Sequence, residues 1–189
     1  MPCADPNYQA KRSLELKEIS SADQGDRAWQ MRGEQSSLSI LEKMGENDLK
    51  RRMRVGEIFG EGCLKSADDY ASAFIVFQHG NTSGQYFQAF VWSKEALLMG
   101  SAQVSKVDVA MAIDRYLVST GHKELFGTQA SQPNLNGCWC IQPIEDSFPE
   151  TIRSEYRGGK NTEYTGLNFL KTLNKGTSCP SSYWESKYH

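Results

Sequence analysis

The chain has 189 residues, of which 39% are hydrophobic and 23% charged, and its formal net charge is −2. This balance is typical of one globular domain, and the lack of a broad positive field argues against nucleic acid and anionic lipid as partners. The N-terminal stretch has no apolar signal region, and no run reaches the roughly 18 apolar residues of a membrane span, so we expect a soluble, cytoplasmic protein.

Helices are predicted along the first two thirds of the chain. Residues 1–20 are polar with few apolar anchors, so we expect a partly ordered N-terminal segment there. The first helix is expected to start at Ser21 or Asp23, and the second to cover "ENDLKRRMRVGEIFG", with acidic residues near its start. The third is expected from about Asp68 to His79 and the fourth over "GQYFQAFVWSKEALLMG", because a glycine ends each of them.

The fifth helix, "SKVDVAMAIDRYLVSTG", carries the clearest start and end. Ser105 and Asp108 have the spacing of a capping box, and Gly121 follows the last turn. On a helical wheel, Asp114 falls in the middle of the apolar face. The sequence therefore predicts a buried carboxylate at this position.

The sequence pattern changes after the fifth helix. "LFGTQASQPNLNGCWCIQPIED" predicts a small β-hairpin or two short strands near residues 125–145. "FPETIRSEYRG" and "TGLNFLKTL" predict two short helical segments. We therefore expect a mainly α fold, a compact single-domain helical bundle over residues 21–173, followed by a flexible tail over 174–189.

Five cysteines are an odd count in a chain without an export signal, which favours reduced thiols over a disulfide framework. Cys138 and Cys140 form "CWC", and in an extended segment their thiols would share one face. This spacing differs from that of thioredoxin-like and zinc-binding motifs. We predict no metal, with a site at this pair as a minor alternative.

Polar residues recur where the apolar pattern predicts at least partial burial. They form four groups along the chain: Asp23, Gln24 and Arg27; Gln78 and His79; Asp114 and Arg115; Thr128 and Gln129. Because Asp and Arg are almost never fully buried unless paired, we expect the groups to meet. Arg27 and His79 are the candidate partners of Asp114. Asp23, the carbonyls around Gly127 and an anionic ligand are the candidates for Arg115.

The segments "DQGDR", "FQHG", "IDRYLVSTG", "FGTQ" and "IEDSFPETIRSEYRG" follow one another between about residues 21 and 170. In order and spacing they resemble an uncharacterised, mainly bacterial family, a domain of unknown function with DQxxR, QH, DR and YGTQ motifs. The resemblance implies a compact helical domain and no particular activity. The chain departs from the pattern at Lys123, where the family tends to have a glutamine, and at Phe126, where it has a tyrosine.

Two functions of different classes are consistent with these residues. The first is a small enzyme in which His79 is a general acid or base, because histidine titrates near neutrality, and Asp114 orients it. A polar or anionic small molecule or peptide would be the substrate of this acid–base chemistry, which we expect to be hydrolysis or a related step. Its binding residues are predicted to be Gln78, Arg115, Thr128, Gln129 and Arg27.

The second function is a non-catalytic binding module, accessory to a toxin, defence or biosynthetic system. In that interpretation the same charged residues only hold the helices together, and His79 caps the end of its helix. No phosphate-binding or dinucleotide-binding loop is present in the sequence, so no cofactor is predicted. The enzyme and the module thus differ in whether the polar residues meet a ligand.

Overall fold

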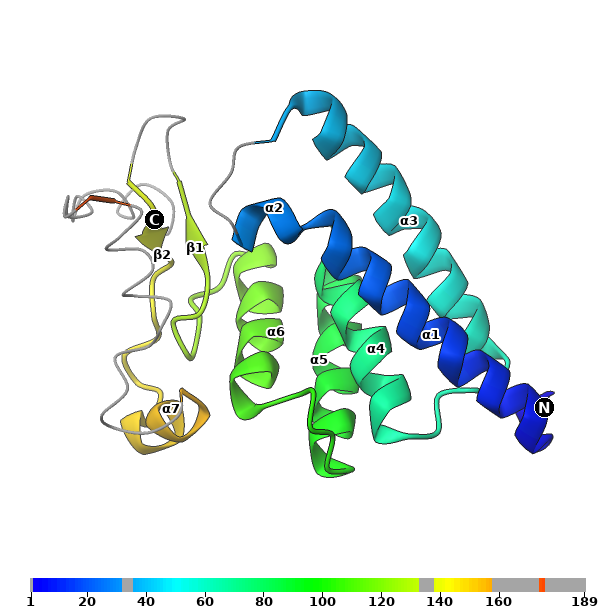
Figure 1. Ribbon diagram of the computed structural model, residues 1–189. Coiled ribbons are helices and arrows are strands. Elements are labelled where there is room, and N and C mark those ends of the chain that lie inside the picture. Colours follow the sequence, from blue (N-terminus) through cyan, green and yellow to red (C-terminus); the bar gives the residue numbers. More distant parts are fainter. Residues whose placement is uncertain (1, 32–35, 133–137, 158–173, 176–189) are drawn as a thin grey trace. The chain divides into compact units, whose positions relative to one another are not determined.

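The computed structural model describes residues 2–31, 36–132, 138–157 and 174–175. It is mainly helical with a small two-stranded antiparallel sheet, which confirms the predicted fold class (Figure 1). The chain divides into two compact units, residues 1–105 and 106–189, and each is described by itself. The single domain over 21–173 stays a prediction, and nearly all of the expected tail lies outside the described residues.

The first unit is helical throughout. Its elements are η1 (Pro2–Ala4), α1 (Pro6–Asp26), α2 (Ala28–Met31), α3 (Leu38–Gly60), α4 (Ala67–Gln78) and α5 (Ser83–Leu98). Helix α4 contacts α1, α3 and α5, and its buried residues include Phe74 and Val76. Phe77 packs edge to face on Trp92 of α5, with ring centroids 4.5 Å apart. The third predicted helix is therefore the central one, as its apolar residues indicate.

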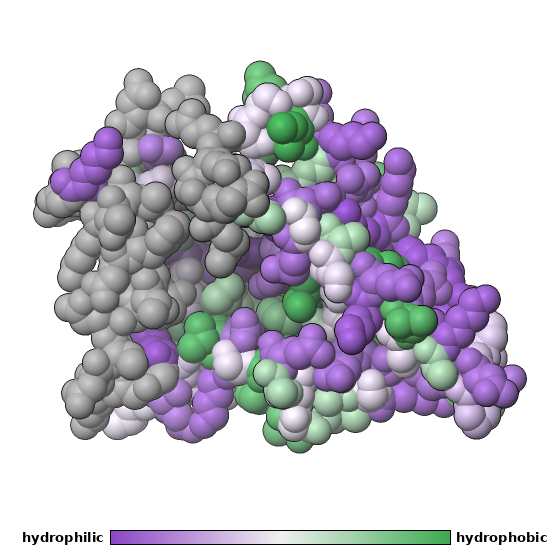
Figure 2. Space-filling model, in the orientation of Figure 1, coloured by the Kyte–Doolittle hydropathy of each residue, from purple (hydrophilic) through white to green (hydrophobic). Residues whose placement is uncertain are grey.

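The outer faces of α1 and α3 are polar. Figure 2 shows hydrophilic side chains over most of this face of the two helices, with hydrophobic ones in separate patches. The buried residues of α1 are Leu16, Ser20 and Asp23, so this helix places a carboxylate among its few inward-facing positions. Neighbouring groups have to compensate this burial, because a carboxylate that loses its hydration without gaining new partners destabilises the fold.

Helix α1 begins at Pro6, so the predicted start at Ser21 or Asp23 is wrong. The side chain of Asp5 caps the helix by accepting the amide N–H of Asn7 at 2.9 Å, and proline takes the first helical position. The partly ordered segment over residues 1–20 stays a prediction, and residues 6–20 lie within this helix. A polar segment needs few apolar anchors when it is capped and cross-linked.

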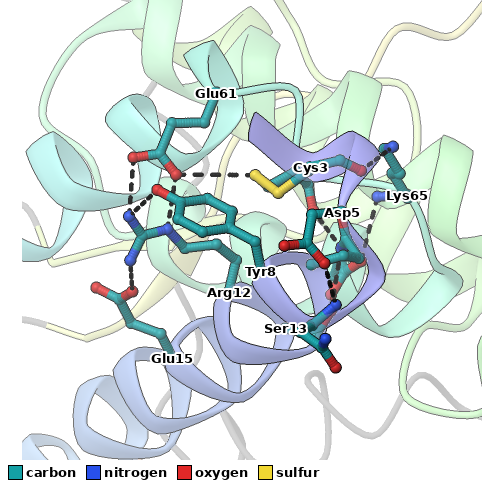
Figure 3. Close-up of a disulfide and its surroundings, with 12 residues drawn as sticks. Cys3, Asp5, Tyr8, Arg12, Ser13, Glu15, Glu61 and Lys65 are labelled. Atoms are coloured by element: carbon teal, nitrogen blue, oxygen red, sulfur yellow. Dashed lines mark hydrogen bonds and ion pairs between the residues drawn. A yellow bond between two sulfur atoms is a disulfide. The ribbon is translucent and has the colours of Figure 1, made fainter. Parts of the chain in front are cut away.

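A disulfide joins Cys3, in the first turn of the chain, to Cys63, between α3 and α4 (Figure 3). The Cα atoms are 5.3 Å apart, and the bond closes a loop of 60 residues. The prediction of reduced thiols is therefore wrong at this pair. Cys140 is disulfide-bonded as well, whereas Cys138 is a free thiol.

Arg12 strengthens the same corner of the unit (Figure 3). Its Nε donates to Glu61 at 2.6 Å and its Nη1 to Glu15 at 2.7 Å, while the ring of Tyr8 lies 4.6 Å from its guanidinium carbon. The Arg12 guanidinium holds the pKa of Glu61 below its usual value. The Arg12–Glu61 ion pair and the Cys3–Cys63 disulfide thus both connect the start of the chain to the end of α3.

The second unit contains α6 (Lys106–Ser119), β1 (Ala130–Ser131), β2 (Cys140–Ile141) and α7 (Glu150–Tyr156). The strands pair antiparallel, with Ala130 opposite Ile141 and Ser131 opposite Cys140, which confirms the predicted strands near residues 125–145. Phe126 packs on Phe148 and Tyr156, with ring centroids 5.2 and 5.1 Å away. The helix expected over "TGLNFLKTL" lies outside the described residues. No helix of the described ranges is long and apolar enough to cross a membrane.

Replacing both Cys3 and Cys63 by serine is expected to lower the free energy of unfolding by about 4 kcal/mol, because the open chain regains the entropy that a 60-residue loop removes. Urea unfolding followed by circular dichroism measures the difference. Cys138→Ser, at a free thiol, is the matched control and should unfold like wild type. Equal stability of the double variant and the control would contradict a cross-link at this pair.

Candidate functional site

His79 is hydrogen-bonded to a buried carboxylate, and that carboxylate is Asp23. The Nδ1 atom of His79 lies 2.7 Å from Oδ2 of Asp23, which is fully buried, while the imidazole keeps 18% of its surface exposed. A carboxylate accepts hydrogen bonds, which makes Nδ1 the donor in this contact. Nε2 has no hydrogen-bond partner among the described residues. The sequence assigned this orienting role to Asp114 instead.

A tight turn holds the backbone of His79. The residue is the C-cap of α4, and its carbonyl accepts a hydrogen bond from Nη1 of Arg52 at 3.0 Å. At Gly80 a Cβ atom would lie 2.7 Å from the Cβ of Gln85, so a larger residue does not fit. Tyr86 donates its hydroxyl to the carbonyl of Gly80 at 2.8 Å. These contacts fix the direction in which the imidazole leaves the helix.

Alternating charges extend from Asp23 across α1 and α3. Nη1 of Arg27 lies 3.1 Å from Oδ1 of Asp23 and donates to Oδ1 of Asp48, also at 3.1 Å. Arg51 continues the series, with 3.2 Å to Asp48 and 2.6 Å to Asp26. The Arg51 guanidinium lowers the pKa of Asp26. Each carboxylate in the series has a cation beside it, which offsets the cost of burying Asp23.

Two further predicted residues lie beside this pair. Gln24 donates from Nε2 to Oδ2 of Asp23 at 3.1 Å, so the oxygen that holds His79 accepts a second hydrogen bond. Gln78 is the last residue of α4 and is partly buried. We call Asp23, Arg27, Asp48, Arg52 and His79 the His79 cluster.

In the second unit Asp114 is fully buried, which confirms that prediction, but its partners are backbone amides. Its carboxylate accepts the N–H groups of Leu125 at 2.8 Å, Phe126 at 3.1 Å and Thr128 at 3.0 Å, and the hydroxyl of Thr128 at 2.9 Å. The expected partners were Arg27 or His79. Amide N–H groups replace them, because several such donors on one carboxylate compensate its charge without a cation.

Glu124 is a second buried carboxyl group here, and the sequence analysis missed it. Its Oε2 accepts the N–H groups of Thr128 and Gln129, both at 2.8 Å. Burial and the charge of Asp114 raise the pKa of Glu124 to about 9, so the group is neutral at pH 7. Its Oε1 is buried and has no hydrogen-bond partner among the described residues. Its segment, "HKELFG", looks like an exposed loop, so no pattern marked it.

The structure brings three predicted substrate-binding residues together. Nε of Arg115 donates to Oε1 of Gln129 at 3.2 Å, and Nε2 of Gln129 donates to the hydroxyl of Thr128 at 3.0 Å and to the carbonyl of Met111 at 3.2 Å. The side-chain amide of Gln129 was not among the partners expected for Arg115. We call Asp114, Arg115, Glu124, Thr128 and Gln129 the Asp114 cluster.

Both the backbone conformation and the available space require a glycine in "FGTQ". Gly127 has φ +71°, and a Cβ there would collide with the guanidinium of Arg157 and with the side chain of Ile144. Arg157 donates from Nε to the carbonyl of Phe126. The backbone can therefore turn back on Asp114 only with glycine at this position. At position 126 the phenylalanine ring packs on Phe148 and Tyr156.

The predicted residues thus form two clusters, one in each unit, and their meeting at a single spot stays a prediction. In the described part of the chain, no three His, Cys, Asp or Glu side chains are arranged to hold a metal ion. No protein-family model, curated protein or solved structure matches the chain. The resemblance to the uncharacterised bacterial family therefore also stays a prediction, and function has to be inferred from the clusters themselves.

Glu124→Gln is expected to change how stability depends on pH. The pKa of Glu124 is about 9 when folded and near 4.5 when unfolded, so the folded chain binds the extra proton between these values. Its contribution to stability is complete below about pH 4.5 and is lost as the pH rises to about 9. The slope is at most about 1.4 kcal/mol per pH unit. Glutamine keeps both the donor and the acceptor, so the variant should lack this decline.

Urea unfolding of wild type and variant at intervals from pH 5 to pH 9 measures the two slopes. Glu124→Ala is the contrasting variant, because it leaves the N–H groups of Thr128 and Gln129 without an acceptor and should be destabilised at every pH. Parallel curves for wild type and Glu124→Gln would show that Glu124 is ionised in the folded chain.

Proposed function

We propose that the chain is a small acid–base enzyme in which His79 exchanges a proton with a polar or anionic small molecule or peptide, as in a hydrolytic reaction. The observation that carries the proposal is the 2.7 Å contact between Nδ1 of His79 and the buried carboxylate of Asp23. A histidine that only caps a helix needs no such carboxylate. A general base does, because the carboxylate selects the tautomer and stabilises the imidazolium.

The proton steps follow from this geometry. Nε2 of the neutral ring accepts a proton from a water molecule or a substrate hydroxyl, and the ring becomes a cation. Asp23 stabilises that cation through Nδ1, at a site where Arg27 already compensates the carboxylate. The imidazolium then returns the proton to the leaving group, which restores the neutral ring. Asp23 therefore takes the positioning role that the sequence analysis gave to Asp114.

The Asp114 cluster of the second unit, taken by itself, is proposed as a ligand-binding segment. Arg115 and Gln129 are the predicted contacts, and their mutual hydrogen bond supports a shared role. Asp114 and Glu124 accept amide N–H groups of the segment that carries Thr128 and Gln129, so they set the shape of that segment. The binding-module alternative is favoured by this second observation, because all of these carboxylate contacts serve the backbone.

The Cys3–Cys63 disulfide bears on where the protein works. Disulfides persist in oxidising compartments and are rare in the cytosol. The cytoplasmic location was predicted from the lack of an apolar signal region and of a membrane-spanning run. It remains a prediction, and the disulfide weighs against it.

His79→Gln is expected to lower hydrolysis at least about 100-fold, because general acid–base catalysis contributes roughly that much. The assay is a panel of chromogenic esters, phosphate esters and aminoacyl anilides. His122→Gln is the matched control: His122 is exposed at the end of α6, and its Nδ1 lies near the hydroxyl of Thr120. Asp23→Asn should also lose activity, because an amide does not stabilise the imidazolium.

Melting temperatures separate the enzyme from the binding module. On the proposed function, His79→Gln and Arg115→Ala melt within a few degrees of wild type. A large fall in melting temperature for both, with hydrolysis absent from wild type, would show that the residues only hold the structure together. Hydrolysis that His79→Gln leaves unchanged would remove His79 from the chemistry.

A further inference from the structure

Arg52 of α3 is a buried cation directly beside the proposed base. Only 7% of its surface is exposed. Its Nη1 donates to the backbone carbonyl of His79 at 3.0 Å, and its Nε has no hydrogen-bond partner. No ion pair joins Arg52 to a carboxylate within the described ranges. The sequence analysis did not single out this residue, because it lies in the charged run "KRRMR" of an amphipathic helix.

Asp48 of α3 and Asp23 of α1, the carboxylates of the same cluster, already bind other cations. Asp48, one turn before Arg52, binds Arg27 and Arg51. Asp23 binds Arg27 and His79. Arg52 is therefore left with a carbonyl as its described partner, whereas Arg27 and Arg51 each bridge two carboxylates.

This arrangement is energetically unfavourable as it stands. A guanidinium has five N–H donors and a permanent charge, and burying a charge without a counterion costs several kcal/mol. A chain that needed only a helix contact at Arg52 would be more stable with a neutral side chain. Among the described residues, no carboxylate contacts the Arg52 guanidinium, and its buried Nε has no acceptor.

We propose that Arg52 binds an oxyanion of the substrate, a carboxylate or a phosphate group, next to His79. The proposal deepens the function proposed above and rests on it for the role of His79. Because Arg52 is bonded to the backbone of His79, an anion held by the guanidinium lies close to the same residue. The planar fork of arginine matches the oxygen spacing of carboxylates and phosphates. The substrate class is thus a small acid or phosphate ester.

The sequence analysis gave anion binding to Arg27 and Arg115, and the structure changes the ranking. Arg27 is neutralised by Asp48 and Asp23, so little of its charge is left for a ligand. Arg115 belongs to the Asp114 cluster of the other unit. Within the His79 cluster, Arg52 is the cation that no described carboxylate contacts.

The test compares anion binding by wild type, Arg52→Gln and Arg54→Gln, with inorganic phosphate and acetate as probes at constant ionic strength. Glutamine at position 52 keeps a donor for the His79 carbonyl and removes the charge. Arg54 is the matched control on the same helix, where it is paired with Glu15 and Glu57. Thermal shift and the NMR signals of the His79 ring report binding.

We expect at least one of the two anions to raise the melting temperature of wild type and Arg54→Gln in a saturable manner, with phosphate and acetate distinguishing the ester from the acid. Arg52→Gln should bind at least tenfold more weakly, and without anion it should melt at or above wild type, because an uncompensated charge is gone. Arg27→Gln should instead melt far below wild type, because it exposes Asp48 and Asp23 to each other's charge.

Equal binding by wild type and Arg52→Gln, or a response that never saturates, would show an adventitious ion only and would overturn the proposal. His79→Gln separates it from the proposed function, because that variant should still bind the anion. Arg52-dependent binding without any turnover supports the anion site and removes the enzyme. Turnover that needs His79 but acts only on neutral substrates supports the enzyme and removes the anion site.

Discussion

The hydrogen bond between Nδ1 of His79 and Oδ2 of Asp23 is the contact on which the chemistry of the first unit depends. At 2.7 Å it joins the end of α4 to α1 and sets which ring nitrogen carries the proton. Arg27 lies beside the buried carboxylate of Asp23, and Asp48 in turn holds Arg27. The orientation of the His79 imidazole thus depends on a series of charged side chains that extends from α1 to α3.

The two units compensate their buried carboxylates by different physical means. In the first, Asp23 and Asp48 are matched by arginines, and every pair requires a cation from another turn or another helix. In the second, Asp114 is matched by backbone N–H groups, and Glu124 by staying protonated. Amide donors hold a loop in one shape, which suits a binding segment. In the first unit, Arg52 is held by a backbone carbonyl, and no carboxylate among the described residues contacts it.

The position of Asp23 also depends on features far from it in the chain. Helix α1 carries Asp23 near its end, while its start is held by the Cys3–Cys63 disulfide and by Arg12 against Glu61. A helix of 21 residues with so few buried side chains would be marginal by packing alone. Cross-linking its start to the connection between α3 and α4 therefore helps to keep the carboxylate in register with His79.

The sequence by itself determined the helices whose caps and apolar faces are local. The third predicted helix ends at His79, Asp114 is buried on α6, and two short strands form near residues 125–145, because capping residues, glycines and periodicity act within one or two turns of chain. The start of α1 was not predicted, because its first turns are polar and the sequence does not show the disulfide that anchors them.

Only the tertiary structure decided which charges meet. From the sequence, Asp114 was the expected partner of His79, since the pairing of His79 with Asp23, 56 positions away, leaves no local trace. Glu124 and Arg52 look like surface residues in their segments, and burial revealed both. Burial and pairing are set by the packing of distant helices, so composition and spacing predict that a polar site exists but not which side chains compose it.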